Sequence, residues 1–373
     1  MINLILFGSF FVMLLLNIPI AVSLGMSSIF ALLFSSSPLT VVPTNVYSGM
    51  AKFLLLAIPF FVLSGNIMAK AGISSRLVAF ADDCVGHRRG GIAIVIPPSI
   101  AFVVYASITG VSVGDMFMGG WIPGIMMGLS LVIIIMIECR KKGIQASKAK
   151  SSWGQRWKSF REAFWGFLMP VIIIGGIYGG VFTPTEAAAV SVVYGLVVGV
   201  FIYREVKMKD MIDILVDSGK TTGGIMLIIG AATLFSYVCT VFGIAQAAQA
   251  LLLEISGNKY IFLLIVNVIF LIAGCFVDAN SAMYIFIPIM FPVAQQLGIN
   301  LVHFGVIATV NLAIGQVTPP VGVNLFVACG VKVKEGLKLT IPEISKAVWP
   351  MIVACILILL LVTYVPWFSL ALL

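Results

Sequence analysis

The sequence predicts an all-α polytopic membrane protein made of two oppositely oriented repeats with broken helices. Three observations support this fold class: the composition, the length of the apolar segments, and two pairs of consecutive prolines inside such segments. Of the 373 residues, 61% are hydrophobic and 10% are charged. A soluble domain carries about 25% charged residues, so the composition excludes a soluble protein.

Apolar segments of the length needed for a membrane crossing recur along the whole chain. A helix needs about 20 apolar residues to cross a bilayer, whereas the strands of a membrane barrel alternate in polarity. The segments here are continuously apolar, which favours helices, although several are too short or too interrupted for a simple crossing. We expect helices near residues 4–16, 18–34, 53–69, 91–109, 121–138, 163–181, 185–203, 222–242, 260–277, 281–297, 302–317 and 349–366.

Enzymes and nucleic-acid-binding proteins need residues that this chain does not group together. The six cysteines are scattered without the spacing of metal ligands, so we expect inert thiols. His87 and His303 are the only histidines, and no Ser/His/Asp set or glycine-rich phosphate loop accompanies them. The sequence therefore predicts no enzyme. The net charge of +8 lies between apolar segments, which favours a lipid bilayer as the partner and argues against nucleic acid.

The basic residues predict the topology. The stretch 139–162 is the most polar part of the chain, and the positive-inside rule places such a stretch in the cytoplasm. Trp153 and Trp157 alternate with its basic residues, so part of it is expected to be an amphipathic helix on the inner membrane surface. No charged residue precedes Lys52 or follows Lys346. We therefore expect both termini on the periplasmic side.

The regions 1–138 and 163–373 are predicted to be the two repeats. Pro19 and Pro184 each lie between two short apolar segments near the start of a repeat. Two glycines then recur at an offset of 171 residues: Gly72 with Gly243, and Gly86 with Gly257. Inverted repeats that contain broken helices are typical of secondary transporters.

The loops that follow the two Pro-Pro pairs support opposite orientations. The loop of the first repeat carries Asp115, which is acidic. The loop of the second repeat is basic and carries Lys332, Lys334 and Lys338. Since basic loops mark the cytoplasmic side, the two loops are expected on opposite sides of the membrane.

The offset between the repeats predicts a missing segment. Pro97-Pro98 matches Pro319-Pro320 at an offset of 222 instead of 171, so the first repeat lacks about 51 residues. The counterpart of roughly 267–317 is therefore absent from the first repeat, and its place is between Val95 and Ile96.

Consecutive prolines inside a membrane helix predict a cavity. Proline removes a helical hydrogen bond, and in lipid the freed carbonyl survives only where it lines a cavity or is buried in protein. Freed carbonyls near the midplane can coordinate Na⁺, and a half-helix N-terminus can face an anionic substrate group. In GQVTPP, Gly315, Gln316 and Thr318 supply oxygen ligands for such a cation. The alternative is a plain kink with Thr318 as a local cap.

The second interruption, GCFVDANSAM, contains the candidate acidic ligand. Asp278 lies between apolar runs, and an ionisable group at membrane depth is a functional hypothesis. With Ser281 it is assigned to the Na⁺ site; the compatible alternative is an N-cap of a re-entrant helix. Glu186 is interpreted instead as part of a capping box. We assign the following residues to the substrate cavity: Pro97, Pro98, Ser99, Asn280, Pro319 and Pro320.

Five motifs then resemble one known family. They are AIPFFVLSGNIM (57–68), IPPSIAFVVYASITGVSVGDMFMGGWIPG (96–124), GGIYGGVFTPTEAAA (175–189), GCFVDANSAMYIFIPIMFPV (274–293) and HFGVIATVNLAIGQVTPPVGVNLF (303–326). On these motifs the chain resembles the DctM-type large membrane subunit of tripartite ATP-independent periplasmic (TRAP) transporters. The resemblance implies an elevator-type, Na⁺-coupled importer in the bacterial inner membrane. It also implies a small four-helix membrane subunit and a periplasmic binding protein that delivers an organic acid, such as a sialic acid or a dicarboxylate.

In that family each repeat contributes a re-entrant hairpin and a Na⁺ site. The hairpin of the second repeat corresponds to residues near 260–297, with Asp278 to Ser281 at its tip and Gly315 to Pro320 opposite. The hairpin of the first repeat has no counterpart in this chain. Two alternatives therefore stay open: a stand-alone elevator-type anion transporter, or a truncated subunit that assembles but does not transport.

Overall fold

The computed structural model describes residues 2–16, 18–85, 99–141, 152–320, 322–329 and 340–373, and all regular structure within these ranges is helical. Seven of the described helices are long and apolar enough to cross a membrane: Phe53–Lys70, Val113–Lys141, Trp153–Tyr178, Pro184–Ile202, Met208–Val241, Lys259–Phe276 and Ile341–Tyr364. The prediction of an all-helical polytopic membrane protein is confirmed. Pro97, Pro98 and the junction at Val95–Ile96 lie outside the described residues.

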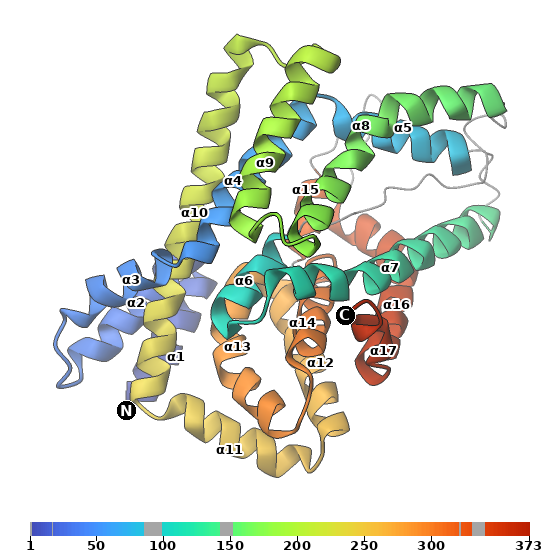
Figure 1. Ribbon diagram of the computed structural model, residues 1–373. Coiled ribbons are helices and arrows are strands. Elements are labelled where there is room, and N and C mark those ends of the chain that lie inside the picture. Colours follow the sequence, from blue (N-terminus) through green and yellow to red (C-terminus); the bar gives the residue numbers. More distant parts are fainter. Residues whose placement is uncertain (1, 17, 86–98, 142–151, 321, 330–339) are drawn as a thin grey trace.

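Figure 1 shows the order of the helices along the chain. The N-terminal part contains α1 (Ile2–Leu15), α2 (Ile20–Leu33), α3 (Val41–Met50), a 3-10 turn (Phe53–Leu56), α4 (Ala57–Lys70), α5 (Ile73–Val85), α6 (Ile100–Thr109) and α7 (Val113–Lys141). The C-terminal part contains α8 (Trp153–Tyr178), α9 (Pro184–Val197) with a π-helical turn (Val198–Ile202), α10 (Met208–Val241), α11 (Ile244–Ser256), α12 (Lys259–Phe276), α13 (Ala279–Gln296), α14 (Leu301–Gly315), α15 (Val323–Cys329), α16 (Ile341–Tyr364) and α17 (Trp367–Leu370).

Helices from the two halves of the chain pair with each other. The helix α2 packs against α10, and α4 packs against α9, so each half supplies one partner to each pair. Small residues allow these approaches. A Cβ added to Gly195 of α9 would lie 3.3 Å from the side chain of Ile67 in α4, and one added to Gly25 of α2 would lie 3.7 Å from the Cβ of Ala231 in α10. The long helix α10 stands beside α4 and α9 in Figure 1.

The predicted capping box is present at the start of α9. The Thr183 hydroxyl accepts a hydrogen bond from the Glu186 amide at 3.3 Å, and the Glu186 carboxylate accepts one from the Thr183 amide at 2.7 Å. This reciprocal pair satisfies two of the amide groups that a helix start leaves without partners. In the first half, Pro19 stands at the N-cap of α2 without a side-chain cap bond.

Two amphipathic helices were missed by the search for apolar segments. Both α5 and α11 contain 13 residues, and each follows a glycine with positive φ, Gly72 (65°) and Gly243 (70°). Only glycine adopts this backbone readily, which explains the glycine match at an offset of 171. With 13 residues each, both helices are shorter than the roughly 20 residues that a membrane crossing needs. Figure 1 places α5 near the top of the molecule and α11 at the bottom.

The C-terminal part of the predicted linker 139–162 is helical. The helix α7 continues to Lys141, residues 142–151 lie outside the described part of the chain, and α8 begins at Trp153 after Ser152 caps its Gln155 amide. Trp153 and Trp157 are exposed. The first part of α8 lies beside α5, and α8 then changes direction (Figure 1). This agrees with an amphipathic surface helix; its place at the inner membrane surface stays a prediction.

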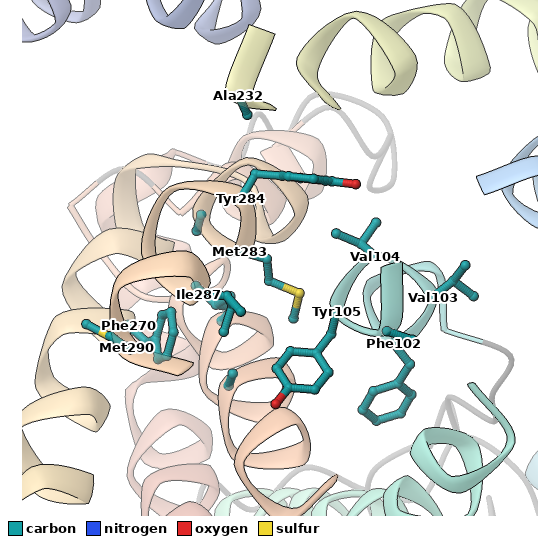
Figure 2. Close-up of a cluster of buried hydrophobic side chains, with 14 of the residues drawn as sticks. Phe102, Val103, Val104, Tyr105, Ala232, Phe270, Met283, Tyr284, Ile287 and Met290 are labelled. Atoms are coloured by element: carbon teal, nitrogen blue, oxygen red, sulfur yellow. The ribbon is translucent and has the colours of Figure 1, made fainter. Parts of the chain in front are cut away.

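A large apolar core joins α6 to the α12–α13 pair. Tyr105 of α6 faces Met283 and Ile287 of α13, all of them buried (Figure 2). Phe102, also buried, contacts the ring of Phe117 in α7 instead. The Tyr105 hydroxyl donates a hydrogen bond to the Leu301 carbonyl at 2.7 Å. The segment that follows the first Pro-Pro pair is thereby packed against the candidate hairpin of the second half.

Candidate functional site

The tip of the α12–α13 pair consists of two residues, Val277 and Asp278, and Asp278 caps α13. Its Oδ1 accepts hydrogen bonds from the amides of Asn280 (3.0 Å) and Ser281 (3.2 Å), and its Oδ2 accepts one from the Ser281 hydroxyl. The N-cap alternative considered for Asp278 is thus the conformation that the structure contains. An ionised carboxylate offers about four acceptor positions, so these three bonds leave room for a further donor or a cation.

The other interruption, which contains Thr318, Pro319 and Pro320, lies between α14 and α15. The amide of Thr318 bonds back to the Gly315 carbonyl at 2.9 Å, and its hydroxyl donates to the Ile314 carbonyl at 2.8 Å. Pro319 and Pro320 then end the ladder because neither has an amide hydrogen. The Thr318 hydroxyl oxygen keeps acceptor capacity that could bind a cation.

The two interruptions meet in space. Gly274, near the end of α12, contacts Gly315, at the end of α14; a Cβ on Gly315 would lie 2.6 Å from the Gly274 Cα. Beyond the break, the Gly322 amide donates to the Cys275 carbonyl at 2.9 Å. The φ angle of Gly322 is 51°, which favours glycine. The structure therefore packs Gly274 and Cys275 against Gly315 and Gly322. This agrees with the family resemblance, which implies that Gly315 to Pro320 lie opposite the hairpin.

The predicted site residues differ in exposure and in partners. Ser281 and Gly315 are buried, and Pro320 is exposed. The remaining described residues are half-buried: Ser99, Asp278, Asn280, Gln316, Thr318 and Pro319. Ser99 stands at the N-cap of α6 without a side-chain cap bond. Pro97 and Pro98, assigned to the same cavity, lie outside the described residues.

Four polar residues near these segments were not singled out from the sequence as site residues. The main-chain amide of Asn324 donates to the Gln316 carbonyl at 3.1 Å, which fixes α15 to the break. Lys52 donates to the Ser107 carbonyl at 2.8 Å, and the Ser107 hydroxyl lies 3.0 Å from that of Tyr284 in the second turn of α13. The available sequence signal was Lys52 itself, the first charged residue of the chain.

A cavity of about 340 Å³ lies elsewhere, between α4 and α10. Its lining includes Asn66, whose amide donates to the Ser218 hydroxyl at 2.8 Å, and Lys70, which pairs with Asp210 at 3.3 Å. Asn66 had no assigned role from the sequence, and the structure gives it this helix-to-helix bond. None of the lining residues belongs to the two interruptions, so this cavity is separate from the candidate site.

The oxygen atoms of the two interruptions suit a hard cation as ligands. It offers main-chain carbonyls, two hydroxyls and one carboxylate, and such oxygen ligands are preferred by hard cations over soft metals. Within the described ranges, no group of three or more His, Cys, Asp or Glu residues could hold a metal ion. The residues of segments 274–281 and 315–322 thus fit an ion such as Na⁺ better than a transition metal.

The comparison with protein families decides the family. The model of the tripartite ATP-independent periplasmic transporter, DctM component, matches residues 7–96 and 92–368. The chain belongs to the DctM family. It is therefore the large permease subunit of a TRAP transporter, a multi-pass protein of the inner membrane and not an enzyme. The predicted resemblance is confirmed, and the second matched segment includes both interruptions.

Individual DctM-type relatives match nearly the whole chain. The C4-dicarboxylate TRAP transporter large permease protein DctM of Rhodobacter capsulatus is 35% identical over 437 positions, covering 99% of this chain and 98% of the relative. The sialic acid TRAP transporter large permease protein SiaM of Vibrio cholerae is 32% identical, with 92% and 91% covered. The isethionate TRAP transporter permease protein DctMQ of Oleidesulfovibrio alaskensis is 33% identical, with 97% of this chain and 65% of the relative covered.

Proposed function

We propose that this DctM-type permease is Na⁺-coupled and imports an organic acid delivered by a periplasmic binding protein. The observation that carries the proposal is the packing of Gly274 and Cys275, just before the hairpin tip, against Gly315 and Gly322, on either side of the break. From this packing we infer that the carboxylate of Asp278 and the oxygens around Thr318 share one site. The names of the relatives indicate the substrate class, since a C4-dicarboxylate, isethionate and a sialic acid are all organic anions.

The roles of the site residues follow from their chemistry. Asp278, Ser281, Gly315, Gln316 and Thr318 would hold Na⁺, which supplies the positive charge that couples binding to the ion gradient. The substrate would lie beside the ion, along Ser99, Asn280, Pro319 and Pro320 together with Pro97 and Pro98. The N-terminus of α13 carries a partial positive charge and would face an acidic group of the substrate, as half-helices do in other transporters.

Two repeats of opposite orientation, 1–138 and 163–373, are part of the proposal. The reciprocal packing of α2 with α10 and of α4 with α9 supports them. The equal lengths of α5 and α11, and their places at opposite ends of the molecule, support them as well (Figure 1). In the proposed elevator motion, α6 and α12–α16 move together past the scaffold of α1–α4 and α8–α10. Both chain termini would be periplasmic.

A first repeat without its hairpin would change what this form can do. The family match runs in two pieces that meet at residues 92–96, the place where about 51 residues are predicted to be missing. The alignment with the Rhodobacter relative spans 437 positions, whereas this chain has 373 residues, so at least 64 positions lie opposite gaps. Both facts support the missing segment, and with it a second candidate function: a subunit that assembles without transporting.

The proposed partners are a small four-helix membrane subunit and a periplasmic binding protein. A tripartite transporter has three components, and this chain is one of them. The chain covers 65% of the DctMQ relative, which leaves room in that protein for a further membrane component. No nucleic acid partner is proposed, and the exposed apolar helix faces suit lipid and the small subunit.

Uptake into liposomes tests the proposal. The permease would be reconstituted with its small subunit, and purified binding protein loaded with a C4-dicarboxylate, isethionate or a sialic acid would be added outside. We expect uptake that needs an inward Na⁺ gradient and all three proteins. Uptake without the binding protein would support the stand-alone transporter. No uptake in the presence of every partner would support the non-transporting subunit.

Thr318→Val is expected to raise the Na⁺ concentration needed for half-maximal uptake by about fivefold, the effect of losing one hydroxyl contact of about 1 kcal/mol. Valine keeps the shape of threonine but has no oxygen to offer. The matched control is Thr309→Val on the preceding helix α14, because that hydroxyl bonds to the Gly305 carbonyl one turn earlier, at 2.8 Å. If Thr318→Val leaves the Na⁺ requirement at the wild-type value, Thr318 is not a ligand.

A further inference from the structure

A chain of polar side chains crosses the apolar interior below the candidate site. Asn267 of α12, Asn311 of α14 and Thr363 of α16 are each at most 2% exposed. The Asn311 amide nitrogen donates to the carbonyl of Asn267 at 3.0 Å and to its side-chain oxygen at 2.8 Å. The Asn267 amide nitrogen in turn donates to the Thr363 hydroxyl at 3.1 Å. Side chains of three helices, α12, α14 and α16, are therefore joined by hydrogen bonds.

This network is poorly explained as a source of stability. Side-chain hydrogen bonds between membrane helices contribute about 0.6 kcal/mol on average, whereas an unpaired buried polar atom is costly. Asn311 Oδ1 is buried without a hydrogen-bond partner among the described residues. The same holds for Nδ1 of His303, whose other ring nitrogen lies 3.2 Å from the Thr363 carbonyl oxygen. Apolar side chains at these positions would avoid that cost, so a role in fixing geometry is the better explanation.

The network lies on the interface between α12 and α14, which also contains the contact between Gly274 and Gly315. Asn311 is four residues before Gly315 on α14, and Asn267 is seven residues before Gly274 on α12. Residues separated by four or seven positions share one face of a helix. The asparagine pair and the Gly274–Gly315 contact are thus two points on one interface. Two points fix both the distance and the rotation between α12 and α14.

We propose that Asn267 and Asn311 are positioning residues for the cation site. By locking the register of α14 on α12, they hold the oxygens of residues 315–318 at a set distance from the hairpin tip at Asp278 and Ser281. The double acceptor that Asn267 presents, carbonyl and side-chain oxygen together, aligns the Asn311 amide in a single orientation. This inference rests on the proposed Na⁺ site.

The test compares Asn311→Leu with the wild type in the complete reconstituted transporter. Leucine has a similar volume, removes the unpaired Oδ1 atom and leaves Asn267 without its donor. We expect the Na⁺ concentration for half-maximal uptake to rise by about tenfold, while the maximal rate and the amount of protein change little. Thr309→Val, two residues away and bonded only within α14, serves as the control and should match the wild type.

A second measurement, hydrogen–deuterium exchange in Na⁺-free buffer, does not depend on transport. The amides of Gly322 and Asn324, which bond to Cys275 and Gln316 across the break, should exchange faster in Asn311→Leu and not in the control. If Asn311→Leu does not accumulate in the membrane, the milder Thr363→Val, which removes the acceptor that orients Asn267, should shift both readouts in the same direction.

The outcomes separate this inference from the proposed function. Unchanged exchange at Gly322 and Asn324 would overturn the positioning role, and so would faster exchange with an unchanged Na⁺ requirement. A wild-type transporter that needs no Na⁺ would overturn the proposed Na⁺ coupling and, with it, the role of the asparagines toward that ion. A joint shift in exchange and Na⁺ requirement, absent from the control, supports the proposal.

Discussion

Uptake by the Asp278→Asn variant is expected to need at least about tenfold more Na⁺ than the wild type, because a hydrogen bond or contact to a charged group is worth about 1.5–3 kcal/mol. Asparagine is as good an N-cap as aspartate. Its side-chain oxygen can still accept from the amides of Asn280 and Ser281, as Oδ1 of Asp278 does at 3.0 and 3.2 Å. The variant therefore keeps the amide bonds at the start of α13. It removes the negative charge and also the oxygen that accepts from the Ser281 hydroxyl, because an amide NH₂ group replaces Oδ2.

Asp278→Ala is the companion variant, since it removes the charge and the cap together. Losing the cap costs about 1 kcal/mol, so this variant should be somewhat less abundant in the membrane than Asp278→Asn. The Na⁺ dependence of uptake should still change more than the amount of protein in the membrane. The two quantities would be measured side by side, as uptake against Na⁺ concentration and as protein per milligram of membrane. An Asn variant with wild-type Na⁺ dependence, or an Ala variant that loses both equally, would reduce Asp278 to a structural cap.

Gly315→Ala is expected to abolish uptake and to lower thermal stability. The added Cβ would lie 2.6 Å from the Cα and 2.8 Å from the carbonyl carbon of Gly274. Both are backbone atoms, so no side chain can move aside and α12 and α14 must separate. Overpacking of this kind costs about 1–3 kcal/mol, and the separation would also displace the oxygens of the break from the hairpin tip.

Gly128→Ala on α7 is the matched control for this change, because no atom lies within 4 Å of the added Cβ. The reciprocal variant, Gly274→Ala, should behave like Gly315→Ala, since its Cβ would lie 2.9 Å from the Gly315 Cα and 3.1 Å from the Leu312 carbonyl oxygen. Thermal unfolding in detergent and uptake in liposomes would be recorded for all three. Wild-type values for Gly315→Ala would mean that the close crossing is not needed for transport.

Much of the candidate site was open to prediction because its signals are local. A capping box involves residues three apart, so Thr183 and Glu186 identify a helix start without knowledge of anything distant. Asp278 could be singled out in the same way, because a charge inside an apolar stretch is costly wherever the stretch lies. Even its capping role was foreseeable, since its partners, Asn280 and Ser281, are two and three residues away.

The amphipathic helices and the buried asparagines were harder to anticipate. The helices α5 and α11 are too short to be found as membrane crossings. Gly72 and Gly243, which precede them, matched in the sequence, but their positive φ angles are visible only in the structure. Asn267 and Asn311 each stand alone in an apolar run. A single amide gives no sign of its partner, which here lies 44 residues away along the chain.

The sequence by itself determined the membrane class, the apolar helices, the caps and the positions of the breaks. These features depend on hydropathy and on interactions within about one helical turn. The tertiary structure alone decided that Gly274 meets Gly315, that α2 pairs with α10 and α4 with α9, and that Asn311 binds Asn267. Such contacts depend on how side chains fit across helices, because in lipid the apolar character of a helix does not choose its partner and close packing does.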